Sequence, residues 1–176
     1  MTDRTLPEEV TIGPGRMEEA ERVADLWVAL AEGQRRHGSH LRAEANRASV
    51  LDSTRRHVVA EHLLVGRQRP SADDGECAVV GFVTFGPESG TFEQSVNRGR
   101  VENIYVVPDE RGCGIGSALL RAAEEALAAA GADVVSLDVM ADNDAARRFY
   151  RRHGYGPHRV TMERPAGSDT HTSPDD

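Results

Sequence analysis

Apolar residues recur at helical spacing in the first third of the chain. One face of residues 17–34 is apolar and acids lie in its first turn, which predicts an amphipathic helix. A second helix is predicted over residues 45–67, where three apolar residues share a face. Residues 35–42 between the two helices form a polar connection that carries His37 and His40.

The spacing changes to that of β-strands from residue 77 onward. Residues 77–85 are almost continuously apolar, which predicts a buried central strand. Residues 101–107 are rich in β-branched and aromatic side chains and end before Pro108, which cannot donate to a central ladder, so they predict a second long strand. Further strands are predicted at residues 10–12, 91–95, 134–139 and 155–164.

Two more helices are predicted among these strands. One begins near Ser117, presents a regular apolar face and is capped by Gly131. A shorter helix begins at a cap formed by Asp142 or Asn143 and runs to Arg152. The predicted order is therefore strand, two helices, three strands, helix, strand, helix, strand.

Length and composition indicate one domain. A chain of 176 residues with 39% hydrophobic content can bury a core, and no repeat or linker divides it, so we expect a single domain over residues 1–164 and a disordered polar tail over residues 165–176. No stretch reaches the length of a membrane span and the N-terminus is charged, so a cytoplasmic protein is expected. Cys77 and Cys113 lie in different contexts, which indicates neither a disulfide framework nor a metal site.

The charge is acidic, with 29 acids against 21 basic residues, all of them arginine. So acidic a surface argues against nucleic acid as a partner. A cationic substrate is one reading of this balance. A GC-rich genome or a salt-loving host explains the same composition, and we favour this second explanation, because composition reports background more than function.

Three glycines at every second position, Gly112, Gly114 and Gly116, follow the strand at 101–107 and open the next helix. Their backbone N–H groups can converge at a positive helix end, which predicts a phosphate cradle. A Walker loop requires a lysine after its last glycine, and the chain has none. A dinucleotide-binding fold is a closer alternative, because Asp138 lies where a ribose-binding acid is expected. The glycine spacing and the short remaining chain argue against it.

The glycines also fit a pyrophosphate clamp of the form Arg/Gln-x-x-Gly-x-Gly/Ala, with Arg111, Gly114 and Gly116 in register. A second motif reads Asn-Asp-Ala-Ala-Arg-Arg-Phe-Tyr-Arg-Arg-His-Gly-Tyr from Asn143. With both motifs in this order, the chain resembles the Gcn5-related N-acetyltransferase (GNAT) superfamily, best over residues 79–155. The resemblance implies an α/β (α+β) fold in which helices flank a mixed, mostly antiparallel central sheet with splayed central strands.

The resemblance also implies that acetyl-CoA is the co-substrate and that no metal is needed. The pantetheine amides would pair with the backbone of the strand around Tyr105, the amides of the glycine loop would hold the pyrophosphate, and the N–H of Val106 would face the thioester oxygen. The expected cofactor-binding residues are Ile104, Tyr105, Val106, Arg111, Gly112, Cys113, Gly114, Ile115, Gly116, Ser117 and Asn143.

Two residues are the catalytic candidates that the resemblance implies. Tyr150 is expected to be the general acid that protonates the leaving thiolate, although without the motif it reads as an aromatic core residue. Glu102 is expected to be the general base, acting through an ordered water, with a solvated or salt-bridged strand residue as the alternative. His37 and His40 are weaker candidates for the base or for contact with the acceptor.

The acceptor is expected to be a primary amine of a small molecule or peptide, attacked directly in a ternary complex. Neither nucleic acid nor a membrane is expected as a partner, and a homodimer is compatible with the resemblance. The alternatives are a catalytically silent acyl-CoA-binding module and, less favoured, a dinucleotide-dependent oxidoreductase.

Overall fold

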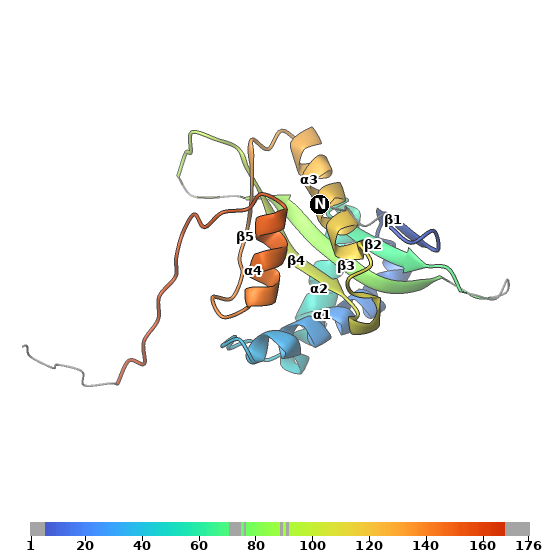
Figure 1. Ribbon diagram of the computed structural model, residues 1–176, viewed down its shortest axis with the longest axis horizontal. Helices are drawn as coiled ribbons and strands as arrows, with labels where there is room; N and C mark the ends of the chain where they lie inside the picture. Colours follow the sequence, from blue (N-terminus) through green and yellow to red (C-terminus); the bar gives the residue numbers. More distant parts are fainter. Residues whose placement is uncertain (1–5, 71–74, 76, 89, 91, 168–176) are drawn as a thin grey trace, which may run out of the picture.

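A five-stranded sheet organises the described part of the molecule (Figure 1). The computed structural model describes residues 6–70, 75, 77–88, 90 and 92–167. The strands lie in the order of the chain: β1 (Val10–Pro14), β2 (Leu63–Gln68), β3 (Ala78–Pro87), β4 (Arg98–Val106) and β5 (Val134–Leu137). The first three pairings are antiparallel, whereas β4 and β5 are parallel because a helix crosses over between them.

In the part of the chain that the structure describes, four α-helices flank the sheet: α1 (Ala20–Arg35), α2 (Arg47–Val59), α3 (Ile115–Ala129) and α4 (Asp144–Arg152). Short 3-10 turns at Met17–Glu19, Glu44–Asn46 and Pro108–Glu110 precede α1, α2 and the glycine loop. In Figure 1, α1 and α2 lie behind the sheet and α3 lies in front of it. The mixed, mostly antiparallel sheet with helices on both faces confirms the fold class expected from the sequence. It also rules out the doubly wound parallel sheet of a dinucleotide-binding fold.

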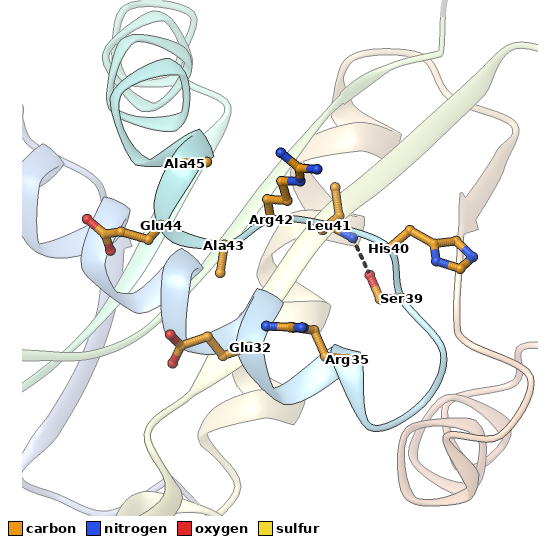
Figure 2. A pocket seen from close by; sticks show the side chains of 9 residues that line it. All are labelled: Glu32, Arg35, Ser39, His40, Leu41, Arg42, Ala43, Glu44 and Ala45. Atoms are coloured by element: carbon orange, nitrogen blue, oxygen red, sulfur yellow. Dashed lines mark hydrogen bonds between the residues drawn. The ribbon is translucent and has the colours of Figure 1, made fainter.

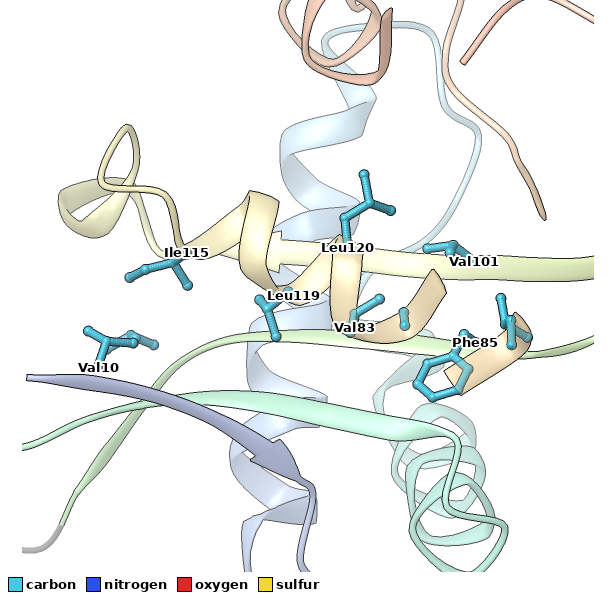
Figure 3. Close-up of a cluster of buried hydrophobic side chains, with 10 residues drawn as sticks. Val10, Val83, Phe85, Val101, Ile115, Leu119 and Leu120 are labelled. Atoms are coloured by element: carbon cyan, nitrogen blue, oxygen red, sulfur yellow. The ribbon is translucent and has the colours of Figure 1, made fainter. Parts of the chain in front are cut away.

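Two apolar clusters fill the space between these layers. The larger one joins α3 to the sheet, and Figure 3 shows Leu119 and Leu120 of α3 beside Val83 and Val101 of the sheet. The smaller cluster packs Val23 and other residues of α1 against the opposite face. The apolar face of α3 predicted from the sequence is therefore the face that is buried. No helix in the described part of the chain is long and apolar enough to cross a membrane.

The helix predicted over residues 45–67 is wrong in its second half. Helix α2 ends at Val59, Glu61 turns the chain at a positive φ of 60°, and strand β2 begins at Leu63. Strand β2 pairs with both β1 and β3, and those backbone hydrogen bonds outweigh a helical periodicity that rested on three residues.

Two other predicted strands do not form. Residues 155–164 contain no strand, and the side chains of Val160 and Met162 are 76% and 90% exposed, because no element buries them. The predicted strand at 91–95 is also wrong over residues 92–95, where Phe92 is exposed; Thr91 itself lies outside the described residues. Most of the predicted tail, residues 168–176, also lies outside them.

Strand β4 departs from regular pairing on both sides. Two consecutive residues of β3 pair with Asn103 and Val101 of β4. Glu102, which lies between them, is therefore the extra residue of a β-bulge. Pairing with β5 stops at Val101 and Leu137, while β4 continues to Val106. The two central strands therefore splay apart, as expected.

Candidate active site

The glycine loop presents an uncapped helix end. Gly112 and Gly114 have positive φ angles of 78° and 90°, and Gly114 is the N-cap of α3. No side chain among the described residues caps this end, and the first intrahelical bond is made by Ala118 N–H to the Gly114 carbonyl. The amides of the first turn, from Ile115 onward, therefore have no helical partner and favour a negatively charged ligand.

Arg111 ties this loop to the end of β4. Its Nε donates to the Val106 carbonyl at 2.8 Å, and its guanidinium lies 5.2 Å from the centroid of the Tyr105 ring. Cys113 is exposed, and its Sγ is 3.7 Å from the Arg111 carbonyl oxygen. The loop is thus held against the same part of β4 that has separated from β5.

The open side of β4 exposes backbone groups. The N–H of Val107 donates to Val80 of β3 at 2.9 Å. Because successive N–H groups of a strand point to opposite sides, those of Ile104 and Val106 point away from β3. On that side β4 has no strand beside it beyond Val101 within the described residues. An extended amide chain can therefore pair here as an added strand.

Helix α4 places aromatic side chains beside the loop. Asn143 caps the helix, and its Oδ1 accepts a hydrogen bond from Ala146 N–H at 3.1 Å. Phe149 lies against Gly116, where an added Cβ would stand 3.6 Å from the ring. The Phe149 and Tyr150 rings are 5.2 Å apart, edge to face. The second motif is thus brought to the N-terminal end of α3.

Tyr150 is largely buried, and burial raises the pKa of its hydroxyl to about 12. The hydroxyl is therefore protonated at neutral pH, and no hydrogen bond within the described part of the chain uses it. Tyr155, whose hydroxyl donates to Glu124 of α3 at 2.6 Å, packs 5.9 Å from the Tyr150 ring. Tyr150 is both a packing residue and an available proton donor.

Glu102 is paired with a histidine of helix α2. Its Oε2 is 3.0 Å from Nε2 of His57 on α2, and Nδ1 of the same ring is 2.8 Å from the Ser53 carbonyl oxygen. The hydrogen bond from His57 outweighs burial and lowers the pKa of Glu102, and the same bond raises the pKa of His57. Beside the bulge, Trp27 Nε1 donates to Asn103 Oδ1 at 3.1 Å and fixes the strand.

His37 and His40 lie elsewhere. The ring of His40 contacts Glu163 at 3.2 Å, with both side chains exposed, and Nε2 of His37 accepts from Arg36 at 3.3 Å. His40 lines a cavity of about 460 Å³ between the C-terminal part of α1 and the connection that follows it, at the end opposite Glu32 in Figure 2. The structure thus pairs Glu102 with His57, which the sequence did not single out, because their contact spans 45 residues. Asp138, the residue of the dinucleotide alternative, pairs with Arg100.

Comparison with known proteins agrees with this geometry. A model of the acetyltransferase (GNAT) family matches residues 27–155. A mycothiol acetyltransferase of Clavibacter michiganensis is 37% identical over 132 residues, which is 75% of this chain but 39% of that protein. The chain thus spans about two fifths of the length of this relative.

Solved structures share the fold. An acetyl transferase from Pyrococcus furiosus superposes with a TM-score of 0.67 at 27% identity, covering 89% of this chain and 99% of that one. A GCN5-related N-acetyltransferase from Ralstonia eutropha gives 0.68 at 21% identity over 90% and 99% of the two chains. An aminoglycoside N-acetyltransferase solved with CoA gives 0.64 at 19% identity over 89% and 95%. Because the family model matches more than half of its residues, the chain belongs to the acetyltransferase (GNAT) family.

Proposed function

We propose that this protein transfers the acetyl group of acetyl-CoA to a primary amine, by direct attack of the amine in a ternary complex. The observation that carries the proposal is that two sets of backbone groups without hydrogen-bond partners among the described residues lie close together. One is the uncapped start of α3 at Gly114, and the other is the open side of β4 at Val106. The first suits a pyrophosphate and the second suits the amides of a pantetheine arm. The matching aminoglycoside acetyltransferase was solved with CoA, which supports this ligand.

The chain's own groups supply what acetyl transfer needs. The N–H of Val106 points to the open side, where it can stabilise the oxyanion that forms on the thioester carbonyl. Glu102, half exposed on the bulge, takes a proton from the acceptor. Tyr150 donates its proton to the sulfur as the thiolate leaves. When bound, acetyl-CoA supplies the activated acyl group.

The acceptor is proposed to be a small molecule that bears an amine. Support comes from the mycothiol acetyltransferase relative and the aminoglycoside acetyltransferase of like fold. The half-exposed Glu102 carboxylate also suits a cationic amine. Peptide amines form the second class to test.

A thiol-release assay tests the function. Purified protein is mixed with acetyl-CoA and a panel of amino sugars, polyamines, amino acids and peptides, and free CoA is followed with time. Release that depends on one amine class, with the acetylated amine identified by mass spectrometry, is the expected result. Tight acetyl-CoA binding with no release for any amine would instead identify a silent acyl-CoA-binding module.

A further inference from the structure

His57 and Glu102 form a contact that the family motifs do not contain. Helix α2 carries His57 and the β4 bulge carries Glu102, and the two side chains are 17% and 40% exposed. The imidazole is held at both nitrogens, at 2.8 Å by the Ser53 carbonyl and at 3.0 Å by the Glu102 carboxylate. The carboxylate is thus open to solvent, whereas the ring behind it is mostly covered.

The hydrogen-bond partners fix where the protons are. A carbonyl oxygen can only accept, so Nδ1 of His57 carries a hydrogen that it donates to Ser53. Nε2 then faces a carboxylate oxygen, and a hydrogen bond between them requires a proton on one of these two atoms. Without that proton two lone pairs would face each other at 3.0 Å. The pair is therefore built to hold one proton.

We propose that His57 acts through Glu102 as a proton relay, in which the proton that leaves the acceptor ammonium passes to Glu102 and on to Nε2 of His57. The proposal rests on the proposed acetyltransferase function. His57 does not touch the acceptor in this scheme, so it is a positioning residue, and Glu102 is the group that meets the amine.

The relay makes the base stronger than a lone carboxylate. An ordinary histidine is more basic than an ordinary glutamate by about two pKa units, so a proton shared with His57 is held more tightly. The hydrogen bond that His57 donates to Glu102 raises the pKa of His57 against the opposing effects of burial and Arg56. Arg100 and His62 also face the carboxylate and lower its pKa, while Asp138 neutralises Arg100.

The protons and electrons balance. The acceptor ammonium loses one proton to the relay, and the free amine forms the new C–N bond. The C–S bond then breaks, its electron pair stays on sulfur, and Tyr150 protonates the thiolate. The newly acylated nitrogen then gives up its extra proton to the Tyr150 oxygen. The relay releases its own proton to solvent through the exposed Glu102 carboxylate.

The test compares pH profiles. His57→Gln keeps a side-chain donor toward Glu102 but cannot take up a proton, and His62→Gln is the matched control, because His62 faces Glu102 without a hydrogen bond to it. With one amine acceptor, kcat/KM of the native protein rises with pH as the relay loses its proton. We expect the ratio of native to His57→Gln kcat/KM to rise with pH and to reach about tenfold at alkaline pH, because a difference of about two pKa units and a Brønsted slope of about one half give that ratio between the unprotonated bases. The His62→Gln ratio stays flat.

A ratio for His57→Gln that does not change with pH would overturn the relay. A second measurement needs no activity: the ring of His57 is titrated by NMR in the native protein and in Glu102→Gln. The relay predicts a lower pKa of His57 in the variant, and an unchanged titration would refute it. Should no amine be acetylated, the proposed function fails while this titration still decides whether the pair shares a proton.

Discussion

Replacing Gly114 by alanine separates backbone strain from loss of ligand binding, because the same helix offers a matched control. Gly114 starts α3 with φ at 90°, and Gly131 lies just past its end with φ at 92°. A Cβ at Gly131 would meet no atom within 4 Å, so Gly131→Ala reports the strain alone. Left-handed backbone costs a non-glycine residue about 1–2 kcal/mol, and both variants should lose about this much stability.

Only Gly114→Ala should change ligand binding. The first-turn amides of α3 have no partner in the helix, and turning one or two of them away removes charge-assisted hydrogen bonds worth about 1.5–3 kcal/mol each. We therefore expect the Kd for acetyl-CoA to rise about 10- to 100-fold in Gly114→Ala and to stay within about twofold in Gly131→Ala.

Two assays measure these effects. Thermal unfolding should show both variants lower in Tm by about 2–4 °C per kcal/mol lost. Calorimetric titration with acetyl-CoA should then distinguish them. Equal affinities in Gly114→Ala and Gly131→Ala would refute the assignment of this helix end to the ligand.

Three further predictions concern catalysis and stability. Tyr150→Phe should keep acetyl-CoA affinity and lower kcat about 100-fold or more; an unchanged kcat in the release assay would remove Tyr150 as the acid. Leu119→Ala should lower the free energy of unfolding by about 2–5 kcal/mol in urea, because Leu119 is fully buried between α3 and the sheet (Figure 3), and a loss below about 1 kcal/mol would contradict this packing. Burial alone would raise the pKa of Glu19, but its hydrogen bonds with Arg67 lower that pKa below the ordinary 4.5. The stability that this ion pair adds to the folded state is therefore complete above pH 4.5 and is lost as the pH falls through the lower pKa of the folded protein. Glu19→Gln should therefore flatten the acid side of a stability–pH curve, and an unchanged slope would exclude the pair as its cause.

The local sequence pattern was enough to predict the elements on either side of the glycine loop. The apolar face predicted from Ser117 is the buried face of α3, and Asn143 caps α4 as its residue type indicated. Strand β4 was predicted at 101–107 and runs from Arg98 to Val106. In these segments the spacing of apolar residues and the capping residues agree with the tertiary packing.

The wrong predictions concern segments whose structure depends on residues far away along the chain. Leu63, Leu64 and Val65 fit a helix as well as a strand, and the choice is made by pairing with β1 and β3. A last strand is predicted at residues 155–164, but local pattern does not say whether a neighbouring strand is present, and Val160 and Met162 are exposed. The sequence therefore placed both elements wrongly for the same reason.

The candidate site also contains residues that the sequence could identify and residues that it could not. The glycine loop and α4 are contiguous motifs, so their residues could be named in advance. His57 belongs to no motif, and its contact with Glu102 exists because the fold brings α2 beside β4. The β4 bulge that frees Glu102 depends on the register with β3, which no local pattern encodes.

Titration of the purified protein with acetyl-CoA, CoA and NAD in a calorimeter tests the central claim most directly. The account predicts saturable binding of acetyl-CoA and CoA that is weakened in Gly114→Ala, with no comparable binding of NAD. Binding of NAD in preference to acetyl-CoA, or no binding of acetyl-CoA at all, would contradict it.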